Sequence, residues 1–247
     1  MTRWKAASIH LLISASIGLL AGALMFGVWY PPPFFHAAGA DELILLLVGV
    51  DLALGPLLTL IVFRANKRGL MFDLVVIGMF QTAALVYGMS IVLQSRPVFL
   101  VAAVDRLVVV GANDVSDADL VQGSEPRFRS RSWTGPRLVA ARMPTDPIER
   151  SNLAFSALAG RDLQNLPRYY CDYADGGKAL LQRAKPLEQL LKKNAGNGPV
   201  IEGWLRGAGR SANSVVWIPL QANKADMVML LDAQSAEPLK ALRIDPW

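Results

Sequence analysis

The sequence contains a single cysteine and two histidines, and their scarcity excludes several kinds of site. With Cys171 as the only thiol among 247 residues, no disulfide can form within the chain. His10 and His36 both lie in the first 40 residues, so the remainder cannot form a Ser-His-Asp triad or a histidine metal site. A nucleophile-elbow motif and a phosphate-binding glycine loop are also missing from the sequence. We therefore expect no cofactor and no enzymatic activity.

Charge is scarce in the N-terminal part and ordinary in the rest. Residues 1–95 hold 5 Lys/Arg and 4 Asp/Glu, whereas residues 96–247 hold 20 and 16. No basic run of the kind that binds nucleic acid occurs, so nucleic acid is not an expected partner. The alternating Arg127, Arg129 and Arg131 indicate a solvated strand or loop, with contact to an acidic partner or a lipid headgroup as the alternative.

Three long apolar runs dominate the first part and predict transmembrane helices over about 6–30, 42–63 and 72–94. The first run of about 25 residues would form roughly 37 Å of helix, enough to cross a bilayer core of about 30 Å. We predict a transmembrane domain over 1–95 and a water-soluble α+β domain over 96–247. A cleaved signal peptide is the competing interpretation, but its apolar core is normally far shorter than this run.

Basic residues flank the predicted spans on one side only. They are Arg3, Lys5, Arg64, Lys67 and Arg68. The loop over 31–41 contains none, and basic flanks mark the cytoplasmic side of a membrane protein. We therefore expect a multi-pass protein of the bacterial inner membrane, with a cytoplasmic N-terminus and a periplasmic C-terminal domain.

Small residues recur along one face of the first span. Ser14, Gly18 and Gly22 are spaced by four residues, so they share a side of the helix. In a bilayer such a face allows close helix–helix packing. The face either packs against the other two spans or receives a helix from a partner.

An ionisable residue lies inside the second span. Asp51 follows Glu42 by nine residues, which places it roughly 14 Å into the apolar layer. An acid at that depth costs several kcal/mol unless it is paired or hydrated.

Other polar and small residues accompany this acid on the second and third spans. Gly55 and Thr59 share a face with Asp51, Pro56 removes one helical hydrogen bond, and Gln81 lies midway along the third span. Three interpretations remain: a structural Asp51–Gln81 hydrogen bond, a site that receives a polar group from another transmembrane segment, and a proton or ion relay.

The second part shows mixed helix and strand signals. Strands are expected over 98–104 and 107–111 as a hairpin, within 133–142, and over 214–221, 226–232 and 239–244. Helices are expected from Asp146 to Ala159, and over 178–184 and 186–193. The pattern predicts a small α+β domain with antiparallel strands.

Three tyrosines surround the lone cysteine. Tyr169, Tyr170 and Tyr173 lie within a stretch of five residues. They either pack in the core or form a protein interface, because tyrosine buries a large area at low entropic cost.

Several motifs together resemble the TfpX/TfpZ family of type IV pilin accessory proteins. The matching segments are Arg3-Trp4-Lys5, 9–14, 28–31, 33–35, 48–51, 54–59, 67–73, Leu166-Pro167, Tyr169-Tyr170, Pro186-Leu187 and 244–247. The resemblance extends over the chain and is most specific in the first 100 residues.

This resemblance implies an inner-membrane accessory protein without enzymatic activity that supports assembly of its cognate major pilin. The implied partners are the transmembrane helix and the periplasmic head of that pilin, together with the lipid bilayer. The intramembrane residues and the tyrosines would provide the two contacts. The alternative is a membrane-anchored periplasmic sensor or adaptor that binds another envelope component.

Overall fold

The structure is a computed structural model that describes residues 2–65 and 67–247. It divides into two compact units, residues 1–96 and residues 97–247. Each unit is described by itself below.

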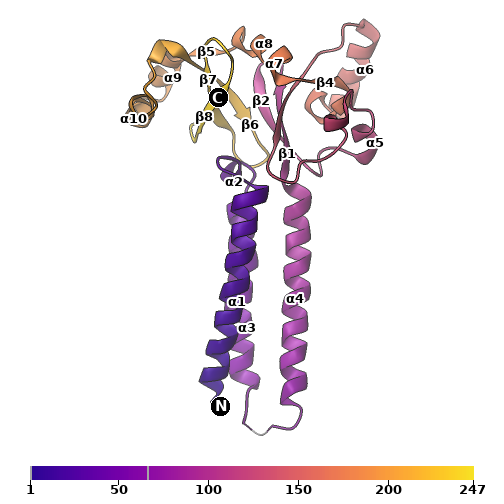
Figure 1. Cartoon of the computed structure of the whole chain (residues 1–247), viewed down its shortest axis with the longest axis vertical. Helices are drawn as coiled ribbons and strands as arrows, with labels where there is room; N and C mark the ends of the chain where they lie inside the picture. Colours follow the sequence, from indigo (N-terminus) through magenta and orange to yellow (C-terminus); the bar gives the residue numbers. More distant parts are fainter. Residues whose placement is uncertain (1, 66) are drawn as a thin grey trace. The chain divides into compact units, whose positions relative to one another are not determined.

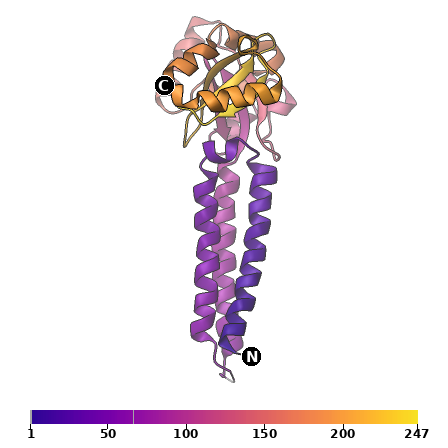
Figure 2. The same cartoon turned by 90° about the vertical axis from the view of Figure 1, so that its left-hand side faces the viewer.

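The first unit is a bundle of three long helices. Its elements are α1 (Arg3–Leu24), extended by a π-helical turn over Met25–Trp29, α2 (Phe34–Ala37), α3 (Ala40–Val62) and α4 (Leu70–Ser95) (Figure 1). The long helices run side by side in both views (Figure 1, Figure 2). By length and composition, all three can cross a membrane. The three predicted segments are therefore confirmed as apolar helices.

Small residues allow the helices to approach one another closely. A Cβ atom added at Gly18 of α1 would lie 2.7 Å from Cγ1 of Val48 on α3. One added at Gly22 would lie 3.3 Å from Cδ1 of Ile44. On the other side of α3, Leu47 occupies the space beside Gly88 of α4. Helix α3 thus packs against both of its neighbours.

The end of the bundle that includes α2 has an apolar core of its own. Its buried residues are Met25, Tyr30, Phe35, Ala40 and Val92. The hydroxyl of Tyr30 donates a hydrogen bond of 2.8 Å to the carbonyl of Val92, which ties the turn after α1 to α4.

The second unit is built on one eight-stranded sheet. Along the sheet the order is β4 (Tyr170–Cys171), β3 (Arg137–Ala141), β1 (Pro97–Ala103), β2 (Arg106–Gly111), β6 (Val215–Gln221), β7 (Met227–Asp232) and β8 (Pro238–Leu242), while β5 (Lys185–Pro186) also pairs with β6. Its helices are α5 (Asp117–Leu120), α6 (Pro147–Leu158), α7 (Tyr173–Gly176), α8 (Lys178–Leu181), α9 (Leu187–Lys193) and α10 (Gly198–Ala208).

The sheet is mixed, so the expectation of antiparallel strands was wrong for two pairs. β1 and β3 run parallel, as do β2 and β6, while the other paired strands are antiparallel. A parallel pair requires a crossover of a dozen or more residues. After β2 the chain continues from Gly111 to Arg137 before it forms β3. This long connection brings β3 to the edge of β1 opposite β2, where it pairs in parallel.

The predicted elements of the second unit otherwise correspond to observed ones. The side chain of Asp146 caps α6 by accepting hydrogen bonds from the backbone of Ile148 and Glu149, and the helix ends before Gly160, whose φ is +80°. Helix α10 was not predicted. It buries Ile201 and Leu205 against β6 and β7 in an apolar core of this unit.

Arg129 and Arg131, for which the sequence indicated a solvated strand or loop, lie in a long loop and hold it in place. Arg129 donates to the carbonyl of Gly123 at 2.8 Å. Arg131 donates to the carbonyls of Ala112 and Val115 and pairs with Asp117. Arg137 donates to the carbonyl of Ser130. These guanidinium groups satisfy backbone carbonyls that no strand or helix pairs.

Candidate functional site: a polar cluster between three apolar helices

A chain of hydrogen bonds joins the three long helices. Nδ1 of His10 on α1 lies 2.6 Å from the hydroxyl of Thr59 on α3. Nε2 of the same imidazole lies 2.7 Å from Oε1 of Gln81 on α4. The Gln81 amide then donates to the backbone carbonyl of Asp51 on α3, at 3.3 Å. The polar side chains thereby satisfy one another in an apolar environment.

The acceptors in this chain determine the form of the imidazole. Oε1 of Gln81 can only accept, so Nε2 of His10 carries the hydrogen. In a neutral imidazole Nδ1 is then the acceptor, and the hydroxyl of Thr59 donates to it. All donors point the same way, from Thr59 through His10 and Gln81 to the Asp51 carbonyl. Aligned hydrogen bonds of this kind polarise and strengthen one another.

Gly55 makes room for the Gln81 side chain. A Cβ atom at Gly55 would lie 2.8 Å from Cδ of Gln81 and would collide with its amide nitrogen. The amide cannot move away without leaving its partners on α1 and α3. Thr59, one turn further along the same face, is 2% exposed. The glycine and the threonine together form the α3 side of the cluster.

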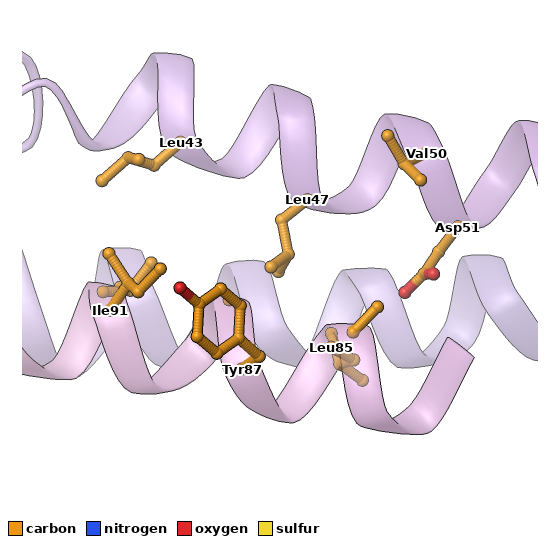
Figure 3. A pocket seen from close by; sticks show the side chains of 10 residues that line it. Leu43, Leu47, Val50, Asp51, Leu85, Tyr87 and Ile91 are labelled. Carbon is orange, nitrogen blue, oxygen red and sulfur yellow. The ribbon is translucent and has the colours of Figure 1, made fainter. Parts of the chain in front are cut away.

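Asp51 lies beside this cluster and lines two grooves. The first has a volume of about 240 Å³ and lies between α3 and α4. It is otherwise lined by apolar side chains and Tyr87, and the Asp51 carboxylate extends toward α4 (Figure 3). The second, of about 160 Å³, lies between α1 and α4 and includes His10, Ser14 and Gln81. Ion pairs among the described residues of this unit, such as Lys67–Asp73, do not include Asp51.

The structure brings together most residues that the sequence singled out in the spans. Asp51, Gly55, Thr59 and Gln81 lie together, and Gln81 bonds to Asp51 through both the backbone carbonyl and the side chain of that residue. Helix α3 continues through Pro56 to Val62.

The remaining residues to place are the small residues of α1 and one histidine that the sequence analysis did not assign to the site. Gly18 and Gly22 face α3, and Ser14, which is buried, lines the groove between α1 and α4. His10 was not expected in the site. An imidazole inside an apolar run is the sequence feature that could have identified it. Only the packing of the helices shows that His10 lies level with Thr59 and Gln81.

The three tyrosines differ in their surroundings. Tyr170 is 2% exposed and packs edge-on against Phe99 and Phe128 in the core. Its burial raises its pKa well above the ordinary value. Tyr169 and Tyr173 are half-buried, and their hydroxyls donate to Glu149 and to the carbonyl of Ala236. A tyrosine interface on this unit would therefore have to use Tyr169 and Tyr173.

A further pocket of about 460 Å³ lies on the second unit, between the ends of β1 and β3 and helices α7 and α8. Cys171 lies close by, against Gly176, and it is a half-buried free thiol. Burial raises the pKa of this thiol, and the nearby Arg142 only partly offsets that effect. Among residues 2–65 and 67–247, no group of three or more His, Cys, Asp or Glu residues could hold a metal ion.

Comparison with known proteins identifies relatives over nearly the whole chain. The family described as Fimbrial assembly protein FimB matches residues 1–39. The fimbrial assembly protein of serogroup I from Dichelobacter nodosus is 31% identical over 246 residues, covering 98% of this chain and 95% of the relative. The protein of serogroup E1 from the same organism is 30% identical over the same shares of the two chains.

A shorter relative matches part of the chain. The fimbrial assembly protein of serogroups C1 and C2 from Dichelobacter nodosus is 34% identical over 120 residues, covering 48% of this chain and 92% of the relative. No solved structure matches. These relatives carry the name fimbrial assembly protein rather than TfpX or TfpZ. Identity of 31% along nearly the full length of both chains shows that the protein belongs to the family of fimbrial assembly proteins.

Proposed function

We propose that this chain is a multi-pass protein of the bacterial inner membrane that binds its cognate major type IV pilin and supports assembly of the pilus. The names of its full-length relatives support a role in fimbrial assembly. Three helices long and apolar enough to span a bilayer support the membrane location. The proposed role is assembly through binding, without catalysis.

The proposed topology has a cytoplasmic N-terminus and a periplasmic C-terminal domain. It is supported by basic residues in the first turn of α1 and between α3 and α4, and by their absence from the connection between α1 and α3. A pilin subunit that waits in the same membrane with its head in the periplasm could then contact both parts of this chain.

The observation that carries the proposal is Asp51 in the wall of two grooves among apolar helices. An acid at such a position in a bilayer is costly, and intramembrane ionisable residues usually mark functional sites. In this proposal Gly55, Thr59 and Gln81 hold the site in shape, and Ser14, Gly18 and Gly22 hold α1 against it. Tyr169 and Tyr173 are the tyrosines available for contact with the pilin head.

Deletion of the gene and replacement with the Asp51→Asn variant tests this function. We expect few surface pili in the deletion strain, and a reduced number with Asp51→Asn at an unchanged level of the protein in the membrane. Asp73→Asn is the control and should leave piliation unchanged. It makes the same substitution at the start of α4, where Asp73 pairs with Lys67 and lines neither groove. Normal piliation of the deletion strain would show that the proposal is wrong.

Co-purification distinguishes this function from a sensor or adaptor. The full-length protein, extracted in mild detergent, is expected to carry pilin as its main partner. Another envelope component in place of pilin would favour the sensor or adaptor. A reporter fused after Trp247 that is active in the cytoplasm would contradict the topology.

A further inference from the structure

We propose that the groove between α3 and α4 seats an apolar transmembrane helix of the partner, which presents a hydrogen-bond donor or a cationic group to the carboxylate of Asp51. This inference rests on the proposed function and specifies which surface of the bundle makes the intramembrane contact and what chemistry the partner must bring.

The size and lining of the groove indicate the kind of occupant. Its volume of about 240 Å³ is smaller than that of typical small-molecule sites, which begin at about 300 Å³. Its walls are almost entirely apolar. Such a space accepts a few aliphatic side chains that project from a helix lying along α3 and α4. Close packing of this kind drives helix association in a bilayer.

The polar atoms around the groove indicate what the partner must offer. The Gln81 amide is engaged on both sides, with His10 at its oxygen and the Asp51 carbonyl at its nitrogen. The amide also forms a side-chain hydrogen bond with Asp51, so Gln81 already has partners on both α1 and α3, and the Asp51 carboxylate is the polar group that lines this groove. The Asp51 carboxylate extends into the space between α3 and α4, beside Val50 and Leu85 (Figure 3). A carboxylate in an apolar wall complements a donor or a cation and repels an anion.

The groove between α1 and α4 is the less suitable of the two. It is smaller, at about 160 Å³, and its polar lining includes His10 and Gln81, which already bond to each other. A helix seated there would have to break that bond or leave it in place without using it. The apolar groove requires no such rearrangement.

Two neighbouring alanines on α4 provide a matched test. Ala84 and Ala83 are both exposed, but only Ala84 lines the α3–α4 groove. We expect Ala84→Trp to reduce the pilin that co-purifies with the full-length protein by about tenfold. The indole would occupy the groove in which the partner helix is proposed to lie. Ala83→Trp, which places the same side chain outside both grooves, should retain the wild-type amount.

A second control examines the other groove. Gly78 lines the α1–α4 groove, and a Cβ atom there would meet nothing within 4 Å. Gly78→Leu should therefore leave pilin co-purification unchanged. Loss with Gly78→Leu alone, or equal loss with Ala83→Trp and Ala84→Trp, would overturn the inference. So would wild-type co-purification with Ala84→Trp.

Cross-linking covers the case in which Ala84→Trp does not accumulate in the membrane. In a Cys171→Ser background, a photoactivatable maleimide is attached to Ala84→Cys or to Ala83→Cys. Position 84 should give the pilin adduct and position 83 should not; an adduct from 83 only, or from neither, contradicts the inference. The deletion strain separates the failure of this inference from the failure of the proposed function. Few pili in that strain, together with wild-type pilin binding by the Ala84→Trp variant, would refute the groove and leave the proposed function standing.

Discussion

His10 and Gln81 are 71 residues apart in the sequence, and Nε2 of the imidazole lies 2.7 Å from Oε1 of the amide. The two side chains come from α1 and α4, the helices that flank α3. Thr59 completes the connection on α3. This polar cluster therefore constrains the rotation of all three helices relative to one another.

A double-mutant cycle measures this connection. We expect His10→Leu and Gln81→Leu each to lower the free energy of unfolding, and the pair to show a coupling of about 0.5–1.7 kcal/mol, as found for hydrogen bonds between membrane helices. Unfolding by SDS of the full-length protein in mild detergent is the measurement. Strictly additive effects of the two substitutions would contradict a direct bond.

Two glycines on α3 provide a matched pair for the space beside Gln81. Gly55→Ala should lower the free energy of unfolding by about 1–3 kcal/mol, because the methyl group displaces the amide from its partners. A Cβ atom at Gly49 would meet nothing within 4 Å. Gly49→Ala should be neutral or stabilise the helix by up to about 1 kcal/mol. Equal effects at the two positions in the same SDS titration would argue against the role of Gly55.

Asp119 and Arg161 provide a test in the second unit. Asp119 is 5% exposed, and its carboxylate pairs with Arg161 and accepts a hydrogen bond from Ser116. Arg161→Ala should lower the free energy of unfolding by about 2 kcal/mol, less than for a fully buried pair because the arginine is partly exposed. Urea titration followed by tryptophan fluorescence measures it. The exposed Arg243→Ala should change stability by less than about 0.5 kcal/mol.

The thiol of Cys171 provides a pH-dependent test. Burial raises its pKa, so the folded protein holds this proton at a pH where the unfolded chain has lost it. The associated effect on stability is nil below the ordinary thiol pKa, and stability falls as the pH rises through that value. Alkylation by iodoacetamide at pH 8 should therefore be slower in the native protein than in urea. Equal rates in the two states would contradict the shift.

Local patterns in the sequence predicted the elements of the fold better than their pairing. Apolar runs identified the three helices, and short apolar segments bounded by turn residues identified β1, β2, β6, β7 and β8. The parallel pairs depend on where long crossovers return, which local periodicity does not encode. Helix α10 was missed because Gly198, Gly203 and Gly207 weaken its helical signal, although Ile201 and Leu205 have the spacing of a buried face.

The candidate site was predictable in its parts and not in its arrangement. An acid, a glycine, a threonine and a glutamine inside apolar spans are conspicuous in any sequence. His10, however, lies roughly 10 Å along α1 from its start, and Gln81 lies roughly 16 Å along α4. Because the helices are offset from one another, counting from their ends does not show that the two residues meet.

The order of synthesis gives this cluster a further consequence. His10 and Thr59 belong to the two long helices that are made first, whereas Gln81 arrives with the third. In a bilayer, the imidazole N–H that later bonds to Gln81 has no water to replace that acceptor. In the proposed membrane location, insertion of α4 supplies the missing acceptor and completes the hydrogen bonding of the two earlier helices.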